Sequence, residues 1–221
     1  LEALARIDGI KRIRFTSPHP AFFNTRLIDA IANTPRVCNS IHLPLQSGSD
    51  RILKAMNRPY TAEQYMRIVN RVKEKCGEIA LSTDIIVGFP GETDGDFEET
   101  RKLMNEVGYD NAYIFKYSPR KGTKAAEQMP DDVPQSVKEE RNQILLADLA
   151  KSSERANDKF VGRTLEVLAE GVSKRNASRW SGRTELSKLV VFEPDAAIRP
   201  GDLVQVRINH ATVMTLFGTL L

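Results

Sequence analysis

Four short apolar runs, each followed by a helical pattern, constrain the fold of this 221-residue chain more than any other feature. The runs are rich in β-branched and aromatic residues and are bounded by Pro, Gly or Ser, as strands are, whereas the segments after them repeat apolar residues at helical spacing. Strands that alternate with helices favour parallel βα units with right-handed crossovers. The expected strands are KRIRFTSP, SIHLPLQ, ALSTDIIVGF and NAYIFKYSP, at residues 11–18, 40–46, 80–89 and 111–119.

The segments that follow these runs have recognisable helix ends. Thr93 and Asp96 are spaced for a capping box, and Gly77 and Gly108 stand where helices are expected to end. Four βα units amount to about half of an eight-stranded barrel. The sequence therefore predicts an α/β fold with part of a TIM-like (βα) barrel. The expected helices cover residues 24–33, 49–57 with 61–77, 93–108 and 133–160.

Beyond residue 158 the pattern changes to short alternating segments separated by turn residues. This pattern is typical of a small β-barrel, and we expect five antiparallel strands. The chain would then consist of a partial (βα) barrel domain, residues 1–158, and a small β-barrel domain, residues 159–221. The expected strands of the second domain are 163–172, 178–185, 188–193, 202–211 and 214–221.

Apolar stretches and cysteines exclude several classes of protein. No run approaches 18 consecutive apolar residues, and charges interrupt the first residues where a signal peptide needs an apolar core. A soluble, cytoplasmic protein without a membrane segment is therefore the expectation. Cys38 and Cys76 lie far apart, with no CxxC pattern and no His at metal-ligand spacing. We expect two reduced thiols, with a disulfide between them as the alternative.

The net charge of +3 is unevenly distributed along the chain. Residues 1–158 hold 23 basic and 23 acidic side chains, whereas residues 159–221 hold 9 basic and 6 acidic ones. The whole positive excess therefore lies in the second domain. A local excess of this sign favours a polyanionic partner for that domain.

Polar residues follow the expected strands. Ligands bind at the carboxyl ends of strands in parallel sheets and barrels. None of these ends offers a nucleophile with a base, or a set of metal ligands, which argues against an unrelated hydrolase or isomerase. The ends suit a polar cofactor that brings its own chemistry. The residues are Thr16, Ser17 and His19, then Gln46 and Ser47, and finally Tyr117, Ser118 and Arg120.

Three motifs carry a resemblance to a known family. IHLPLQSGSDRILKAMNRPYT, TDIIVGFPGET and YSPRKGTKAA, in this order, resemble the radical S-adenosylmethionine methylthiotransferases, and residues 159–221 resemble their TRAM RNA-binding module. GRTELSKLVVF and RFTSPHPAFF are most similar to the MiaB-type branch, which methylthiolates isopentenylated adenosine beside the tRNA anticodon. Branches that modify threonylcarbamoyl-adenosine or a ribosomal protein aspartate are the alternatives, as is a non-catalytic RNA-binding module.

The resemblance also implies cofactors that this chain cannot hold alone. The family uses S-adenosylmethionine and two four-iron, four-sulfur clusters, one of them bound by a CxxxCxxC loop. That loop is absent here, and two distant cysteines cannot replace the thiolates that a cluster requires. We therefore expect the C-terminal half of a partial TIM-like barrel with a TRAM module, taken from a longer enzyme and inactive alone. No metal ligand or catalytic residue is assigned in this chain.

The same resemblance implies positions for the cofactor. The strand that ends in Ile86, Val87 and Gly88 packs against adenine in such barrels, although Asp84 replaces the usual Gly and Glu92 falls one position late. Glycine would allow close backbone approach, and Asp84 could accept a hydrogen bond from a ribose hydroxyl. His42 and His210 are expected to be structural. The cofactor residues predicted are Gln46, Ser47, Asp84, Gly88, Tyr117 and Ser118.

Basic and aromatic residues predict an RNA contact. Small β-barrels bind RNA by neutralising phosphates and stacking bases, and the second domain holds the chain's one tryptophan within a basic segment. The alternative is a solvated basic loop with a half-buried tryptophan. The expected partner is a tRNA anticodon arm, and an exposed edge strand could also allow self-association. The RNA-binding residues predicted are Arg120, Lys174, Arg175, Arg179, Trp180 and Arg183.

Overall fold

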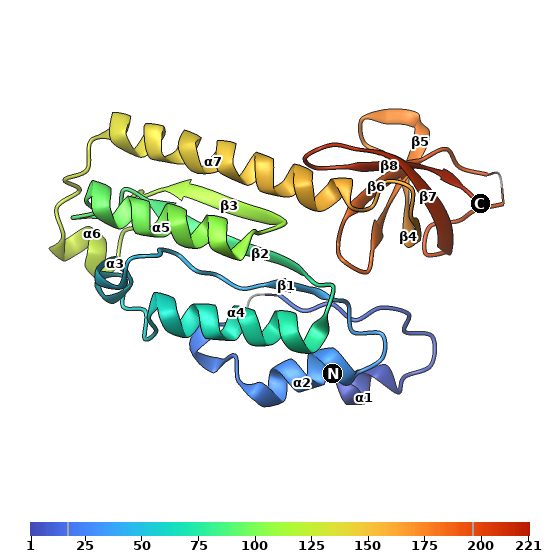
Figure 1. Ribbon diagram of the computed structural model, residues 1–221, viewed down its shortest axis with the longest axis horizontal. Helices are drawn as coiled ribbons and strands as arrows, with labels where there is room; N and C mark the ends of the chain where they lie inside the picture. The colour runs from blue at the N-terminus through green and yellow to red at the C-terminus, as the bar shows by residue number, and fades with distance from the viewer. Residues whose placement is uncertain (17, 196) are drawn as a thin grey trace.

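The structure is a computed structural model that describes residues 1–16, 18–195 and 197–221. A parallel sheet packed with helices occupies one end of the molecule, and a closed β-barrel occupies the other (Figure 1). The long helix α7 (Gln135–Asp158) runs along the sheet and leads into the barrel. Ser17, one of the polar residues expected at a strand end, lies outside the described residues.

The sheet is parallel, as the alternating pattern predicted, but it has three strands rather than four, in the order β1-β2-β3. The first expected strand, residues 11–18, is wrong. In its described part Ile13 alone pairs, bridging to Val37 through two backbone hydrogen bonds of 2.6 and 2.9 Å. Arg12 and Arg14 on either side of it reach instead toward the distant barrel, so the segment does not extend the sheet. The strands are β1 (Ser40–His42), β2 (Ala80–Val87) and β3 (Asn111–Lys116).

The longer helices begin and end close to the predicted residues. Thr93 and Asp96 form the predicted capping box, and Gly77 and Gly108 are the C-cap residues of their helices, both at φ 66°. Three short helices were not predicted: α1 (Glu2–Ala5), the 3-10 helix η1 (Pro20–Phe22) and α6 (Lys124–Gln128). The predicted ones are α2 (Thr25–Asn33), α3 (Asp50–Ala55), α4 (Ala62–Cys76), α5 (Asp94–Val107) and α7.

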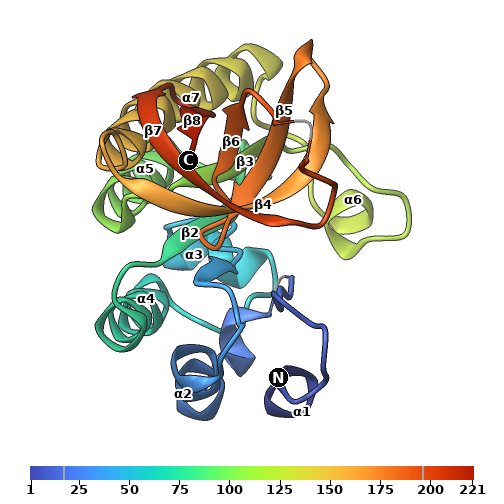
Figure 2. The ribbon, with the colours of Figure 1, turned by 90° about the vertical axis from the view of Figure 1, so that its right-hand side faces the viewer.

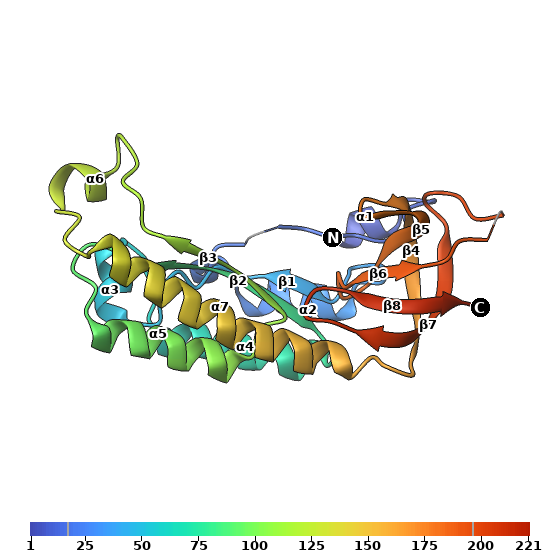
Figure 3. The ribbon, with the colours of Figure 1, turned by 90° about the horizontal axis from the view of Figure 1, so that it is seen from above.

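Helices cover one face of the sheet and leave the other open. Figure 3 shows α4, α5 and α7 together on one side. Residues of β2 alternate accordingly: Leu81, Ile85 and Val87 are buried in the core under these helices, whereas Asp84 and its neighbours two residues away are partly exposed. Edge strand β3 carries exposed aromatic rings, including Tyr113 at 54% exposure. The open face is therefore the one that can meet ligands.

Five strands form the second domain's barrel, closed in the order β4-β5-β6-β8-β7. All neighbouring pairs are antiparallel except β6 and β8, which are parallel. An odd number of strands cannot alternate in direction around a closed ring, so one parallel pair is a geometric necessity. The strands are β4 (Thr164–Ser173), β5 (Asn176–Thr184), β6 (Leu189–Phe192), β7 (Leu203–Ala211) and β8 (Leu216–Leu220).

Ion pairs and hydrogen bonds attach this barrel to the sheet at the amino ends of the strands. Arg163 forms two bonds of 2.7 and 2.9 Å with Glu78, just before β2. Lys188 lies 2.6 Å from Asp110, just before β3. Figure 2, viewed from the barrel side, shows the barrel in front of the sheet and its helices. The carboxyl ends of the strands therefore point away from the barrel.

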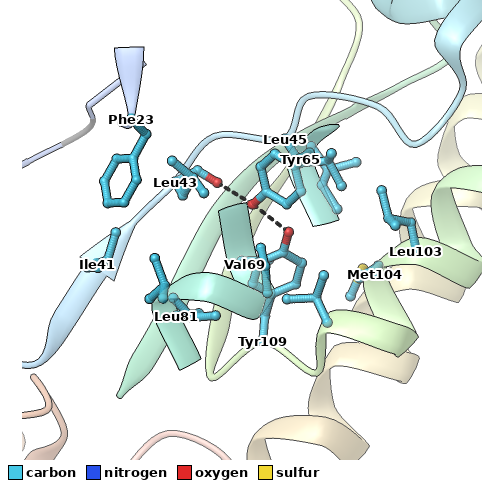
Figure 4. Close-up of a cluster of buried hydrophobic side chains, with 14 of the residues drawn as sticks. Phe23, Ile41, Leu43, Leu45, Tyr65, Val69, Leu81, Leu103, Met104 and Tyr109 are labelled. Atoms are coloured by element: carbon cyan, nitrogen blue, oxygen red, sulfur yellow. Dashed lines mark hydrogen bonds between the residues drawn. The ribbon is translucent and has the colours of Figure 1, made fainter. Parts of the chain in front are cut away.

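A pair of buried tyrosines lies at the centre of the sheet domain's core (Figure 4). Tyr65 on α4 donates a hydrogen bond to Leu43 O at 2.8 Å, and its hydroxyl lies 2.7 Å from the Tyr109 hydroxyl. Burial raises the pKa of both hydroxyls, so they stay neutral at physiological pH. Thr83 also donates to Leu43 O, at 2.9 Å. The network joins α4 and β2 to the residue that follows β1 and to the segment just before β3.

We predict that Tyr65→Phe destabilises the chain more than Tyr109→Phe does. Tyr65→Phe leaves the buried Tyr109 hydroxyl without its partner, at a cost of about 1–3 kcal/mol. Tyr109→Phe leaves the Tyr65 hydroxyl bonded to Leu43 O, so the cost is about 0.5–1.5 kcal/mol. Urea unfolding of both variants measures the difference. An equal or larger loss in Tyr109→Phe would show that this network does not stabilise the core as described.

Candidate functional site

The carboxyl end of β2 is built around a buried glutamate. After β2 the chain turns sharply through Gly88 and Gly91, both with left-handed φ angles of 69° and 77°. The Glu92 carboxylate, 1% exposed, accepts a hydrogen bond from the Gly88 amide at 2.7 Å. Arg141 on α7 donates to the same oxygen at 2.7 Å. The turn, the start of α5 and the middle of α7 are thus held by one carboxylate.

Burial dominates the electrostatics of this carboxylate. Desolvation raises the pKa of Glu92 above its ordinary value of 4.5, although the Gly88 amide and the Arg141 guanidinium oppose the shift. Asp96, four residues on, behaves in the opposite way. Burial alone would raise the pKa of Asp96, but hydrogen bonds from Arg51, Ser49 and Thr93 outweigh it and hold that pKa well below its usual range.

Lys138 fills the space above Gly88. A Cβ atom at Gly88 would collide with the Lys138 side chain, which is 3% exposed and pairs with Asp131 at 2.5 Å. The ammonium group also lies 5.3 Å from the centre of the Tyr117 ring. Gly88 was predicted to leave room for a cofactor's adenine. In this structure the glycine makes room for the Lys138 side chain, and a cofactor contact at Gly88 stays a prediction.

Gln46 and Ser47 face different surroundings. Gln46 adopts φ 71°, unusual for a residue with a side chain, and its backbone pairs with β2 on both sides of Ile85. This conformation turns Ser47 toward α5, where it is fully buried with its hydroxyl 3.2 Å from that of Thr100. The structure does not support Ser47 as a cofactor contact, since its hydroxyl points into the helical layer.

The open face of the sheet holds a polar cluster around Asp84. His42 lies between two acceptors, with Nδ1 3.0 Å from Ser82 Oγ and Nε2 3.2 Å from Asp84 Oδ2. The Tyr113 ring stands 6.0 Å from the imidazole, centre to centre. Asp84 Oδ1 makes no hydrogen bond to another described residue. The Asp84 side chain lies on the open face and His42 fixes its orientation, while its contact with a ligand's hydroxyl stays a prediction.

The segment after β3 forms a projecting loop. Tyr117 is anchored by its amide to Val87 O at 2.8 Å, and Asp132 accepts from the Gly91 amide at 2.7 Å. Between these anchors Ser118 and Arg120 are exposed, and α6 stands well away from the sheet (Figure 3). The structure thus brings Gly88 and Tyr117 together at one edge, while Ser118 and Arg120 point into solvent.

The predicted RNA-binding residues of the barrel divide into two groups. Lys174 and Arg175 are exposed in the turn between β4 and β5, and neither is ion-paired within the described parts of the chain. Arg179 lies 3.7 Å from the exposed Glu193. Arg183 is held by Glu170 at 3.4 Å and donates to Ser187 O, while its own carbonyl accepts from Arg12 at 2.5 Å. Arg183 therefore has a structural role that its charge did not predict.

Trp180 lies on strand β5 and is partly buried, and its contact with RNA stays a prediction. Its partners in the barrel ladder are Phe192 and Val172, and the indole packs partly buried against the barrel core. A base could therefore stack only on the exposed part of the ring. Replacing Trp180 would also remove packing from the barrel, which complicates its use as a test of RNA binding.

Three charged residues that organise the site were not predicted to be site residues. Lys138, Arg141 and Asp96 are buried, although lysine, arginine and aspartate are usually exposed. Asp96 could be read from the capping box, which was identified. The two basic residues lie on the long helix, three positions apart, and this spacing puts both on one face. The buried partner of Arg141, Glu92, lies 49 residues away, and Asp131, the partner of Lys138, lies outside the helix, so no pattern within the helix identifies them.

Two findings bound the chemistry of the described residues. They bring together no group of three or more His, Cys, Asp or Glu side chains suited to a metal ion, and both cysteines are free thiols. None of the helices in the described ranges has the length and apolarity needed to cross a membrane.

Comparison with known proteins gives two matching regions in the order of the two observed folds. Residues 1–104 match the Radical SAM superfamily, and residues 158–221 match the TRAM domain. The chain is 51% identical over its whole length to a tRNA-2-methylthio-N(6)-dimethylallyladenosine synthase of Opitutus terrae, and 50% identical over 97% of its length to that of Acetivibrio thermocellus. It spans 45% and 44% of those proteins, less than half of their length.

A solved structure supports the fold. Coproporphyrinogen III oxidase from Escherichia coli, described as a radical SAM enzyme, aligns with 76% of this chain and 45% of its own at a TM-score of 0.52. The sequence identity is 18%, so this likeness bears on the fold alone. The predicted partial TIM-like barrel is confirmed.

We predict that Arg141→Met destabilises the chain by about 3–5 kcal/mol at pH 7, because it leaves the Glu92 charge buried and unpaired. The pKa of Glu92 is higher in the folded state than its ordinary value of 4.5. The folded state therefore binds the Glu92 proton more tightly than the unfolded state does, and the free energy of unfolding falls as the pH rises from the ordinary pKa through the folded-state pKa. Without Arg141 the pKa rises further, and the loss should be smaller at pH 5 than at pH 7.

Urea unfolding at both pH values measures this effect. The matched control is the double variant Glu92→Gln with Arg141→Met, which has no charge at either position and should show little change in its loss of stability between pH 5 and 7. A loss in Arg141→Met that is independent of pH would mean that the buried carboxylate is not its cause.

Proposed function

We propose that this chain, which belongs to the radical S-adenosylmethionine methylthiotransferase family, supplies the barrel's later strands and the RNA module of a longer tRNA-modifying enzyme. The observation that carries the proposal is the radical SAM region followed by a TRAM region, with about half of all residues identical to curated synthases. The reaction we assign to the longer enzyme adds a methylthio group to isopentenylated adenosine beside the anticodon. We also propose that it acts in the cytoplasm, as two domains meeting near residue 158.

The residues present fit one half of the cofactor. When bound, S-adenosylmethionine supplies a methyl group and, after reductive cleavage, a radical. Asp84 on the open face is placed to accept from ribose hydroxyls, and Tyr117 and Ser118 at the edge of β3 suit the adenine side. Gln46, which bridges to β2 opposite Ile85, is the further cofactor contact that we propose at this strand end. These residues bind and orient the nucleoside, and they leave its methionine end without a partner.

The residues present do not fit an iron–sulfur cluster. A four-iron cluster needs three or four thiolates, and this chain has two cysteines, of which Cys38 is buried at 1% exposure. The cluster ligands must therefore come from another part of the longer enzyme, and we derive no step through them here.

The barrel is the part that we assign to RNA. Its basic turn, Lys174 and Arg175, forms no ion pair with the described residues and can neutralise phosphates, and the partner we infer is the anticodon arm of tRNA. Exposed aromatic rings on edge strand β3 also offer a surface for self-association of the chain alone.

We predict that the chain alone binds no stoichiometric cluster. After anaerobic treatment with iron, sulfide and a reductant, the visible absorbance and the reduced paramagnetic signal should integrate to far less than one cluster per chain. No cleavage of S-adenosylmethionine to methionine and deoxyadenosine should follow, because the ligands are missing. The longer enzyme with its CxxxCxxC loop is the positive control. One cluster per chain in the short form would contradict the proposal.

We predict that the chain binds an anticodon stem-loop with an affinity that falls with salt. Removing two phosphate contacts, in Lys174→Ala with Arg175→Ala, should lower the slope of log K against log salt by about 1.4–1.8. The matched control is Arg71→Ala with Lys102→Ala, two exposed charges on α4 and α5. Fluorescence anisotropy at several salt concentrations measures both. Equal salt slopes in the two variants would mean that Lys174 and Arg175 contact no phosphate and that the turn is an ordinary solvated surface.

A further inference from the structure

The loop between β3 and α7 separates its charges. Asp131 pairs with buried Lys138 and Asp132 accepts from the Gly91 amide, so these acidic side chains are used to fasten the loop. Between Tyr117 and Asp131 the chain holds three basic residues and one acidic residue, Glu127. The basic ones are Arg120, Lys121 and Lys124, all exposed and without an ion pair to any described residue. The result is a positively charged loop on an anchored base.

A turn gathers these basic residues. The Thr123 hydroxyl donates to Arg120 O at 2.8 Å and accepts from the Ala126 amide at 3.3 Å, which caps α6. Arg120, Lys121 and Lys124 therefore project from one compact turn. Three like charges held within one turn repel one another, and an anion placed between them would relieve that repulsion.

The position of this turn relates it to the barrel. It lies at the carboxyl end of the sheet, whereas the barrel is attached at the amino end, and α7 runs between the two (Figure 1). The 24 residues of α7 measure about 36 Å at ~1.5 Å per residue. In Figures 2 and 3 both α6 and β5 lie on the side of the sheet away from α5 and α7. The two basic regions thus flank the same open face.

We propose that the turn at Arg120, Lys121 and Lys124 is a second phosphate-binding contact for the same RNA that the barrel binds. The inference rests on the RNA-binding function proposed above. Because α7 runs between the carboxyl end of the sheet and the barrel, we take its length, about 36 Å, as the scale of the separation between the two contacts. A five-base-pair stem measures at most about 17 Å at ~3.4 Å per base pair. A stem of this length cannot reach the barrel turn and the Arg120–Lys124 turn at the same time. The RNA must extend along the open face, and its length decides whether the turn contributes.

The experiment uses the whole chain and hairpin RNAs that share one loop but have stems of five, ten and fifteen base pairs. The test variant is Arg120→Gln with Lys124→Gln, and the matched control is Arg71→Gln with Lys102→Gln. All four residues are exposed, so both variants should unfold at the parent's temperature. For the fifteen-base-pair RNA, the test variant should lower the salt slope by about 1.4–1.8 relative to the parent. For the five-base-pair RNA it should behave like the parent.

The outcomes are distinguishable. Absence of binding to every RNA overturns the proposed function and the inference with it. Binding by the parent with no change in the test variant at any length overturns the inference alone. An equal slope change for the shortest and longest RNAs overturns the proposal that the RNA must extend along the open face to reach the turn, since the turn and the barrel would then form one compact site. An equal change in the control variant would assign the effect to net charge and also overturn the proposal.

Discussion

The buried ion pair between Glu92 and Arg141 is the contact on which the rest of the structure depends. Its carboxylate holds the Gly88 amide at the end of β2, precedes the cap of α5 and fixes the middle of α7. Two buried charges cost several kcal/mol to desolvate, so the pair stabilises the fold only while both partners are present. Because α7 continues into the barrel, the same contact sets the direction in which the second domain leaves the sheet.

Polar contacts rather than a shared core then fix the barrel's position. The described buried apolar residues form two separate clusters, one under α4, α5 and α7 and one inside the barrel. Between them lie the pairs Arg163 with Glu78 and Lys188 with Asp110, and the bonds from Arg14 to Thr184 O and from Asn157 to Thr212 O. Directional contacts such as these specify one orientation, whereas apolar contact alone tolerates several.

The sequence predicted those features that depend on neighbouring residues. Helix caps at Thr93 and Gly108 and the alternation along the barrel strands are local patterns, and they were correct. The errors arose where a distant partner decided the outcome. Residues 11–18 read as a strand, but Arg12 and Arg14 bond to barrel carbonyls more than 150 residues away. At Gly88, likewise, the neighbour that requires a glycine is Lys138, 50 residues further along the chain.

Glu92 shows the same limit in the site itself. Its displacement by one position from the expected pattern was visible in the sequence, but its burial and its bond to Arg141 were not. The cofactor positions divide similarly. Asp84 lies on the open face because strand alternation places it there, whereas Ser47 turns inward because of the left-handed backbone at Gln46. Alternation can be read from a sequence, and a single unusual φ angle at a non-glycine residue cannot.

Formal charge is a poor guide to the charge that a partner meets. The barrel domain has three more basic than acidic residues, yet Arg163, Arg179, Arg183 and Lys188 are each paired with a carboxylate. Two of those carboxylates, Glu78 and Asp110, belong to the sheet domain. The sheet domain has equal numbers of basic and acidic residues. Because some of its acidic residues pair with the barrel or fasten the base of the α6 loop, fewer of them remain to offset the basic side chains on the rest of its surface. The positively charged surface of this chain therefore depends on which acidic residues are already engaged in ion pairs and hydrogen bonds.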